Sequence, residues 1–434
     1  MTSSTRNIGL FAAMAAALVA VGVFQSWPLA LTILNLCLIS AIMSLGVNIQ
    51  WGYAGLFNVG VMGFTALGGL AGVLISMPPV TAAIEAGGAG ILLSLLLMLV
   101  TVVAAVFVYR RMPKGKPRTF ALIAIIGGGY FLTRYFFYPA VEAIEGVDSA
   151  RTGYLGGLGL PILFSWIIGG LFAAAAAWLV GKISLGLRSD YLAIATLGIS
   201  EIIIAILKNE DWLTRGVKNV TGLPRPVPYE IDLQQAQWFL DWANTLNLTP
   251  EDFSSIFVKL CYAGLFVVVL LILLWLSERA LNSPWGRMMR AIRDNELSAA
   301  AMGKNITGRH LQVFVLGSAV IGIAGAMLTT LDGQFTPASY QPLRFTFIIW
   351  VMVIVGGSGN NFGAILGGFL IWFVWVEAEP FGHWLMDLLT SGMAEDNGLR
   401  LHLLESAAHM RLMTMGVILL IVLRFSPRGL IPEK

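Results

Sequence analysis

Apolar stretches long enough to cross a lipid bilayer recur along almost the whole chain. A helix needs about 20 apolar residues to span the hydrocarbon core, because each residue advances about 1.5 Å and the core is about 30 Å thick. Of the 434 residues, 57% are hydrophobic and 12% are charged, whereas a soluble domain has about 25% charged residues. A helix satisfies its backbone hydrogen bonds within one segment, as lipid requires. The sequence therefore predicts an all-α integral membrane protein, a polytopic bundle of transmembrane helices.

Twelve segments are candidate spans, and two of them, 345–357 and 362–376, are too short to cross the core as helices. Between these two lies the glycine-rich run GGSGNN, with Gly356, Gly357 and Gly359. Such a break predicts a tight hairpin or a pair of half-helices, and broken helices are tolerated where they line a cavity. The three glycines are therefore candidates for a translocation path, with a plain turn as the alternative. The segments are 8–24, 28–49, 54–77, 89–109, 119–138, 157–181, 191–207, 257–276, 313–331, 345–357, 362–376 and 409–424.

Three polar residues in or beside the apolar segments are further candidates for the path. Asn48 and Asn58 bring amide groups to a second glycine-rich break, residues 48–60, and such groups need partners in lipid. Glu201 is the one acid near the middle of a clear span. A carboxylate at the bilayer centre costs about 2.5–3.5 kcal/mol, so it should face a partner or a water-filled path. The alternative is that these side chains hold helices together.

The charged loops predict the orientation of the chain. Basic residues crowd the loop 110–118, the loop 287–309 and the C-terminal end, and Arg6 precedes the first span. Counting spans places all of them on one side, which the positive-inside rule assigns to the cytoplasm. The opposite loops are acidic. The pattern predicts an even number of spans with both termini in the cytoplasm.

The longest polar run on the predicted cytoplasmic side is residues 282–311. A first helix is predicted because spacings of three residues return its charged side chains to one face, namely Arg287, Arg290, Arg293 and Asp294. A second, short helix rich in small residues is predicted to stop at glycine, and it comprises Glu296, Ala299, Ala300 and Gly303. A small-faced helix between two spans suits docking into a groove of a soluble protein. The alternative is a solvated amphipathic loop.

Several stretches resemble the branched-chain amino acid permeases of ABC importers. Glu296 and Gly303 fit the coupling-loop pattern of ABC-importer permeases, Glu-Ala-Ala-x-x-x-Gly, if one residue is inserted. The usual Ile-x-Leu-Pro ending of that pattern is replaced by VFVL at 313–316, a degenerate form that the branched-chain amino acid permeases carry. The other matching stretches are SPWGRMMRAIR (283–293), NIQWGYAGLFNVG (48–60), LRSDYLAIATLG (187–198), TGLPRP (221–226) and LRFSPRGLIP (423–432).

The resemblance implies the membrane permease subunit of an ABC importer for branched-chain or other hydrophobic amino acids in the bacterial inner membrane. Its implied partners are a second homologous permease, two cytoplasmic ATP-binding subunits and a periplasmic substrate-binding protein. The chain itself would bind no cofactor, since ATP and Mg²⁺ belong to the ATPase subunits. The resemblance places four residues in the ATPase groove, Glu296, Ala299, Ala300 and Gly303. It places polar contacts around that groove at Arg290, Arg293 and Asp294.

The resemblance also implies a division of the chain. Residues 1–27 form an N-terminal span, and residues 28–77 and 157–434 form the permease core, including the coupling loop 282–311. Residues 78–156 look like an insertion of two extra spans joined by a basic loop.

Motifs for catalysis are missing from the sequence. It contains no G-x-x-x-x-G-K-[ST] phosphate loop, no H-E-x-x-H, no G-x-S-x-G and no C-x-x-C. We therefore expect a transport subunit that is not an enzyme, carries no metal and binds no nucleic acid. Three alternatives stay open. They are an ABC permease for urea or short amides, an ion-coupled secondary transporter with Glu201 as its one good intramembrane acid, and an integral-membrane enzyme.

Overall fold

The computed structural model describes residues 3–148, 151–393 and 397–433 and shows a helical membrane protein. Within these residues, 10 helices are long and apolar enough to cross a membrane. Each of the twelve predicted segments contains a helix, which confirms the predicted fold class. The helices are α1 (Ser3–Phe24), α2 (Trp27–Ala54), α3 (Val61–Ser76), α5 (Ala89–Arg111), α6 (Lys116–Gly146), α7 (Leu163–Ser184), α8 (Ser189–Asn209), α12 (Pro250–Leu281), α15 (Ile306–Asp332), α16 (Pro342–Gly356), α17 (Asn361–Thr390) and α19 (Met410–Phe425).

The predicted length of segment 362–376 was wrong, because α17 runs over 30 residues. The apolar run stops at Glu377, but the helix continues past it, and distant groups contact its acids. Gln25 donates a hydrogen bond of 2.8 Å to Glu377, and Arg411 pairs with Glu379. Helix α16 is short, with 15 residues, and the turn 357–360 joins it to a full-length partner. The two helices are therefore not a pair of half-helices.

Short elements connect the spans. One two-stranded antiparallel sheet links the connection after α8 to the end of α15, with Val220 opposite Phe335 and Thr221 opposite Gln334. The elements are α4 (Thr81–Ala83), η1 (Ile84–Gly88), α9 (Asp211–Thr214), η2 (Gly216–Lys218), β1 (Val220–Thr221), α10 (Glu230–Gln235), α11 (Gln237–Thr245), α13 (Pro284–Asp294), α14 (Glu296–Ala301), β2 (Gln334–Phe335), η3 (Pro337–Ser339), α18 (Gly398–Glu405) and η4 (Ser406–His409).

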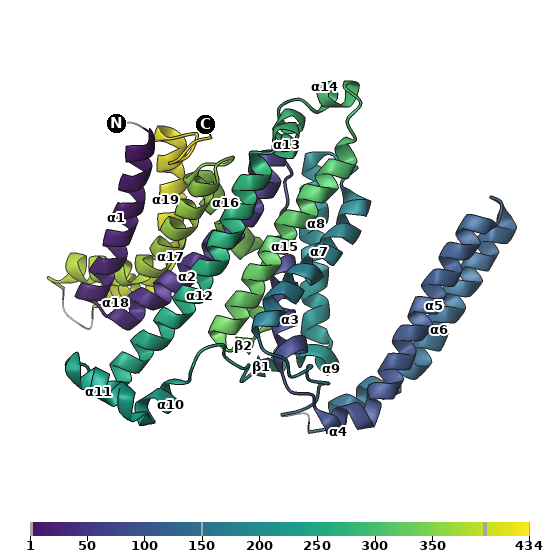
Figure 1. Ribbon diagram of the computed structural model, residues 1–434, viewed down its shortest axis with the longest axis horizontal. Helices are drawn as coiled ribbons and strands as arrows, with labels where there is room; N and C mark the ends of the chain where they lie inside the picture. The colour runs from purple at the N-terminus through teal and green to yellow at the C-terminus, as the bar shows by residue number, and fades with distance from the viewer. Residues whose placement is uncertain (1–2, 149–150, 394–396, 434) are drawn as a thin grey trace.

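The centre of the bundle is α15, which packs on α2, α3 and α7, and α3 also packs on α7. Glycines let these backbones approach closely. A Cβ on Gly68 would collide with the carbonyl oxygen of Gly322, and one on Gly325 would collide with that of Thr65. Helices α5 and α6 pack mainly against each other and stand apart from the bundle in Figure 1. Most of their apolar side chains are exposed, as expected for a hairpin surrounded by lipid.

The elements that carry the predicted cytoplasmic loops share one end of the molecule. Both chain termini, α13, α14 and the tip of the α5–α6 hairpin lie toward the top of Figure 1, and α10, α11 and α18 lie toward the bottom. The basic loops therefore gather at one end, where the charge pattern predicts the cytoplasm. We call this the basic end and the opposite one the acidic end.

Candidate functional site

The polar run 282–311 folds into the two helices that its sequence predicts, α13 and α14. Pro284 occupies the first turn of α13, where a missing backbone N–H costs nothing. Asn295 has an extended backbone (φ −155°, ψ 95°) that ends α13, and its side chain accepts the Ser298 N–H at 2.9 Å to begin α14. Gly303 has a φ of +75° and follows the end of α14. The left-handed conformation explains why the short helix stops at glycine.

Helix α14 projects from the basic end of the molecule (Figure 1) and is largely exposed. Glu296 and Ala300 are exposed and Ala299 is half-buried, while nothing lies within 4 Å of a Cβ built on Gly303. Two large apolar side chains, Leu297 and Met302, are 84% and 78% exposed. Sequence reasoning missed these two residues, although an apolar side chain in a charged loop is the signal that would have found them. Helix α14 therefore projects from the bundle with two exposed apolar side chains.

Helix α13, in contrast, is fixed to the bundle. Met289 and Ile292 are 0% and 1% exposed, and a Cβ on Gly286 would collide with the backbone of Leu281 at the end of α12. Arg287 donates to the Asn282 carbonyl at 3.2 Å, and Arg290 donates to the Leu281 carbonyl at 3.4 Å. These contacts satisfy free carbonyls at the C-terminus of α12. A buried apolar face is not what the alternative of a solvated amphipathic loop predicts for α13.

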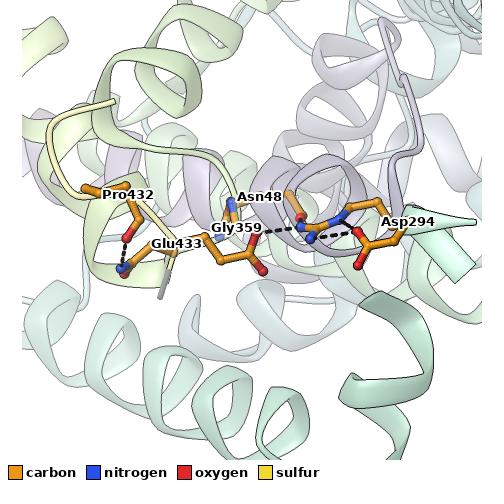
Figure 2. A network of polar contacts seen from close by, with 8 residues as sticks. Asn48, Asp294, Gly359, Pro432 and Glu433 are labelled. Carbon is orange, nitrogen blue, oxygen red and sulfur yellow. Dashed lines mark hydrogen bonds and ion pairs between the residues drawn. The ribbon is translucent and has the colours of Figure 1, made fainter. Parts of the chain in front are cut away.

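Arg293 connects α13 to two other parts of the chain and also pairs with its neighbour Asp294, as Figure 2 shows for its acidic partners. Its guanidinium donates to the carbonyl of Gly52 in the last turn of α2, pairs with Glu433 at 2.9 Å and pairs with Asp294 at 3.1 Å. Partial burial acts to lower the pKa of Arg293, but the hydrogen bonds and charges of Glu433 and Asp294 outweigh it and raise the pKa. The guanidinium is therefore a fixed cation.

Asn48 lies one turn away on α2 and joins the glycine-rich turn to the same region (Figure 2). Its side chain is 0% exposed. Its Oδ1 accepts the Gly359 N–H at 2.9 Å, and its Nδ2 donates to Asn361 Oδ1 at 3.1 Å. Asn361 in turn donates to Glu278 of α12 at 2.8 Å. Two of the predicted site residues, Asn48 and Gly359, are thus in contact.

The C-terminal tail, residues 430–433, covers the end of α16. Leu430 and Ile431 donate backbone hydrogen bonds to the carbonyls of Val355 and Gly356 at 2.9 and 2.8 Å. Ile431 is 2% exposed, and Gly357 has a φ of +121° with no room for a Cβ beside Ile431. The tail therefore holds the α16–α17 turn and, through Glu433, Arg293 as well. Glu433 was missed from sequence, since 140 residues separate it from Arg293.

Asn58 belongs to a second polar cluster, on the other side of the break after α2. Its Nδ2 donates to Gln50 at 2.9 Å, and its carbonyl accepts the Trp350 indole N–H at 3.0 Å. Gln50 donates in turn to the Phe314 carbonyl and to Ser318 of α15. These bonds anchor the non-helical residues 55–60 between α15 and α16. The observed contacts match the alternative interpretation, in which Asn58 holds helices together.

Glu201 lies on an exposed side of the bundle and is not brought near Asn48, Gly359 or Arg293. It lines a hollow of about 730 Å³ between α8, α16, α17 and α19. Lys208 and Arg344 line the same hollow, and most of its other lining residues are apolar. Arg344 stacks on the Trp375 ring at 5.1 Å. This face combines charged and apolar side chains, with Glu201 near the middle of α8 and Arg344 in the first turn of α16.

The contacts at the basic end thus join α13 to α2, to the end of α12 and, through Glu433 and the C-terminal tail, to the α16–α17 turn. Comparison with known sequences identifies the family to which the chain is related. Residues 29–423 match the family described as "Branched-chain amino acid transport system / permease component". The chain belongs to this family of membrane permeases.

Individual relatives agree with this family. The chain is 30% identical over 236 residues to the high-affinity branched-chain amino acid transport system permease protein LivM of Escherichia coli (strain K12), covering 54% of each chain. It therefore spans about half the length of that relative. A probable branched-chain amino acid transport permease protein LivM of Methanocaldococcus jannaschii is 27% identical over 397 residues, which cover 91% of this chain and 90% of the relative. LivH of Salmonella typhimurium is 24% identical over 269 residues, 59% of this chain and 77% of LivH. No solved structure matches the chain.

Proposed function

We propose that this permease is the membrane subunit of an ABC importer that carries branched-chain and other hydrophobic amino acids across the bacterial inner membrane. Both termini would lie in the cytoplasm. The family membership supports the transport role. The observation that carries the ABC mechanism is α14, a protruding helix joined to a helix that is locked to the bundle by Arg293.

The proposed partners are two cytoplasmic ATP-binding subunits, a second homologous permease and a periplasmic substrate-binding protein. The LivM and LivH relatives are each named as a permease protein of a high-affinity branched-chain amino acid transport system, which supports a pair of homologous permeases. Leu297 and Met302, with Glu296, Ala299, Ala300 and Gly303, would enter a groove on one ATPase subunit. ATP and Mg²⁺ would bind to that subunit and not to this chain.

The proposed mechanism is alternating access driven from the basic end. ATP binding would displace the ATPase groove and α14 with it. Helix α13 would follow as a rigid body, because its apolar face is buried. Arg293 would pass the displacement to α2 and, through Glu433 and the tail, to the α16–α17 turn. The bundle would then exchange outward-open and inward-open states, which the ATPase must bind with different affinities.

We place the second permease on the face that holds Glu201. Charged groups facing lipid are costly, so Glu201, near the middle of α8, calls for cover by protein or water. A homologous subunit packed over α8, α16 and α19 would cover this face with protein and enclose a hydrated path between the two chains. Glu201 would lie beside that path. The glycines Gly356, Gly357 and Gly359 would act as a hinge between α16 and α17 at the cytoplasmic end of this path. We also propose that residues 78–156 are a peripheral addition to a core formed by 28–77 and 157–434.

The test is purification of this chain with the products of its neighbouring genes, followed by uptake of labelled leucine or labelled urea into vesicles. Co-purification of an ATPase and a second permease, with leucine uptake that requires ATP, supports the proposal. Urea uptake without leucine uptake would assign the same architecture to the urea or short-amide alternative. Uptake that follows an ion gradient and ignores ATP would favour the secondary-transporter alternative and contradict the proposed role of α14.

A further inference from the structure

A second cavity lies inside this chain, away from the contacts described above. It has a volume of about 260 Å³ and runs between α2, α3, α15, α16 and α17 from the loop 333–341 at the acidic end. Voids larger than a water molecule are few in a well-packed interior, and a cavity of about 150 Å³ takes up benzene. The space is therefore large enough for a branched aliphatic side chain. Its apolar walls consist of Leu36, Ile39, Met43, Met62, Leu328, Phe345, Ile348, Ile349 and Met352.

Polar groups gather at the mouth of this cavity. Asp332, the last residue of α15, lines it with an exposed side chain, and no described Lys, Arg or His forms an ion pair with it. Ser339 and Tyr340 line it as well. The Tyr340 hydroxyl is buried and lies 3.1 Å from Thr329 Oγ1, which fixes its position. The mouth therefore presents one uncompensated carboxylate beside an apolar chamber.

The wall holds a further unused polar group. Trp372 of α17 lines the cavity, and its indole Nε1 is buried without a hydrogen-bond partner among the described residues. A buried donor without an acceptor costs about 1–3 kcal/mol. Helix packing alone gives no reason to keep such a donor at a cavity wall, whereas an oxygen atom of a ligand or of an accompanying water would satisfy it.

We infer that this cavity is a substrate site for α-amino acids with branched or long apolar side chains. The side chain occupies the apolar chamber, and the ammonium group of the substrate pairs with the Asp332 carboxylate at the mouth. Three methionines in the walls adapt to side chains of different shape, because a thioether chain fills irregular space. Urea, which has no apolar group and no charge, gains from neither feature. This inference rests on the proposed function and specifies where the transported molecule binds. Ile348 lines both this cavity and the hollow that holds Glu201, so the cavity adjoins the proposed path.

The experiment uses the assembled transporter in vesicles and photo-leucine, a leucine analogue whose side chain carries a diazirine. Irradiation during turnover should attach the label to cavity-wall peptides of α2 and α16, and unlabelled leucine should compete with it. Asp332→Asn should raise the KM for leucine about tenfold to a hundredfold, because one charge-assisted hydrogen bond is lost. Ile39→Phe should narrow the chamber and shift the preference from leucine toward alanine.

Glu85→Gln is the matched control, because Glu85 is an exposed acid of η1 outside the cavity; its KM should match that of the unaltered transporter. Label found away from the cavity, or Asp332→Asn with an unchanged KM while ATP-driven leucine uptake persists, would overturn this inference and leave the proposed function intact. Failure of the unaltered transporter to take up leucine would instead overturn the proposed function.

Discussion

At the scale of single residues, Arg293 joins three segments of the chain at the basic end, namely α13, α2 and the C-terminal tail. One planar guanidinium contacts the Gly52 carbonyl, Glu433 and Asp294 at the same time. A lysine ammonium carries the same charge but cannot reproduce this fork. The pairs are partly buried, with 24% of the Arg293 side chain exposed. Their loss is therefore felt more than the loss of a surface pair.

We expect Arg293→Lys to reduce leucine uptake about tenfold while the ATPase still co-purifies and hydrolyses ATP, since one or two charged hydrogen bonds are worth about 1.5–3 kcal/mol. Glu433→Gln should have a smaller effect in the same direction. The measurement is the number of leucine molecules taken up per ATP hydrolysed. Arg428→Lys, at an exposed arginine near the same contacts, should leave the ratio unchanged. An unchanged ratio in Arg293→Lys would remove Arg293 from the coupling path.

Gly303 offers a second test at this scale, because substitutions can change its backbone preference without creating a steric clash. Its φ of +75° disfavours a β-branched side chain, whereas asparagine tolerates this region. No atom lies within 4 Å of its missing Cβ, so neither substitution creates a clash within the chain. We expect Gly303→Val to lower uptake strongly with normal membrane insertion, and Gly303→Asn to retain most of it. Normal uptake in Gly303→Val would contradict the assignment of α14 as the docking helix.

At the scale of elements, α13 attaches the polar run 282–311 to the bundle, and α14 is the proposed docking helix for the ATPase. The buried face of α13 makes it part of the bundle, while α14 contributes exposed apolar side chains. We expect Leu297→Asp to abolish co-purification of the ATPase without altering the stability of the isolated chain. Ser298→Asp is the control, since Ser298 is exposed on the same helix and its substitution introduces the same charge. Equal loss in both variants would mean that charge, and not loss of the apolar contact, disrupts the complex.

The elements also show how far the sequence predicts this structure. Apolar segment length found all the spans, and the asparagine cap and Gly303 explain α13 and α14 because these are local signals. The true length of α17 was missed, since its acids Glu377 and Glu379 are contacted by Gln25 and Arg411 from distant parts of the chain. The Arg293–Glu433 pair was missed for the same reason. Contacts between distant segments leave no periodic pattern in the sequence.

At the scale of the whole molecule, the α5–α6 hairpin stands apart from the bundle (Figure 1). The two ends of the hairpin segment lie side by side where they join the bundle. The Val80 N–H donates a backbone hydrogen bond to the Leu155 carbonyl at 3.1 Å. The hairpin meets the remainder through a small contact in which the Phe137 ring lies 5.8 Å from that of Trp212. Its outer surface is apolar. A segment with adjacent ends and few outside contacts is removable without breaking the core.

We therefore expect replacement of residues 82–147 by a short glycine-serine linker to give a protein that inserts, assembles and takes up leucine at near-normal rates. The free energy of unfolding should fall by about 1–2 kcal/mol, because only the apolar contact around Trp212 is lost. This loss is measurable as a small decrease in melting temperature. The control carries the same linker inserted between α5 and α6 with the hairpin intact. Loss of the second permease from the deletion protein alone would show that the hairpin contacts that partner. The apolar outer surface of α5 and α6 would then be a subunit interface, and lipid would not be its only neighbour.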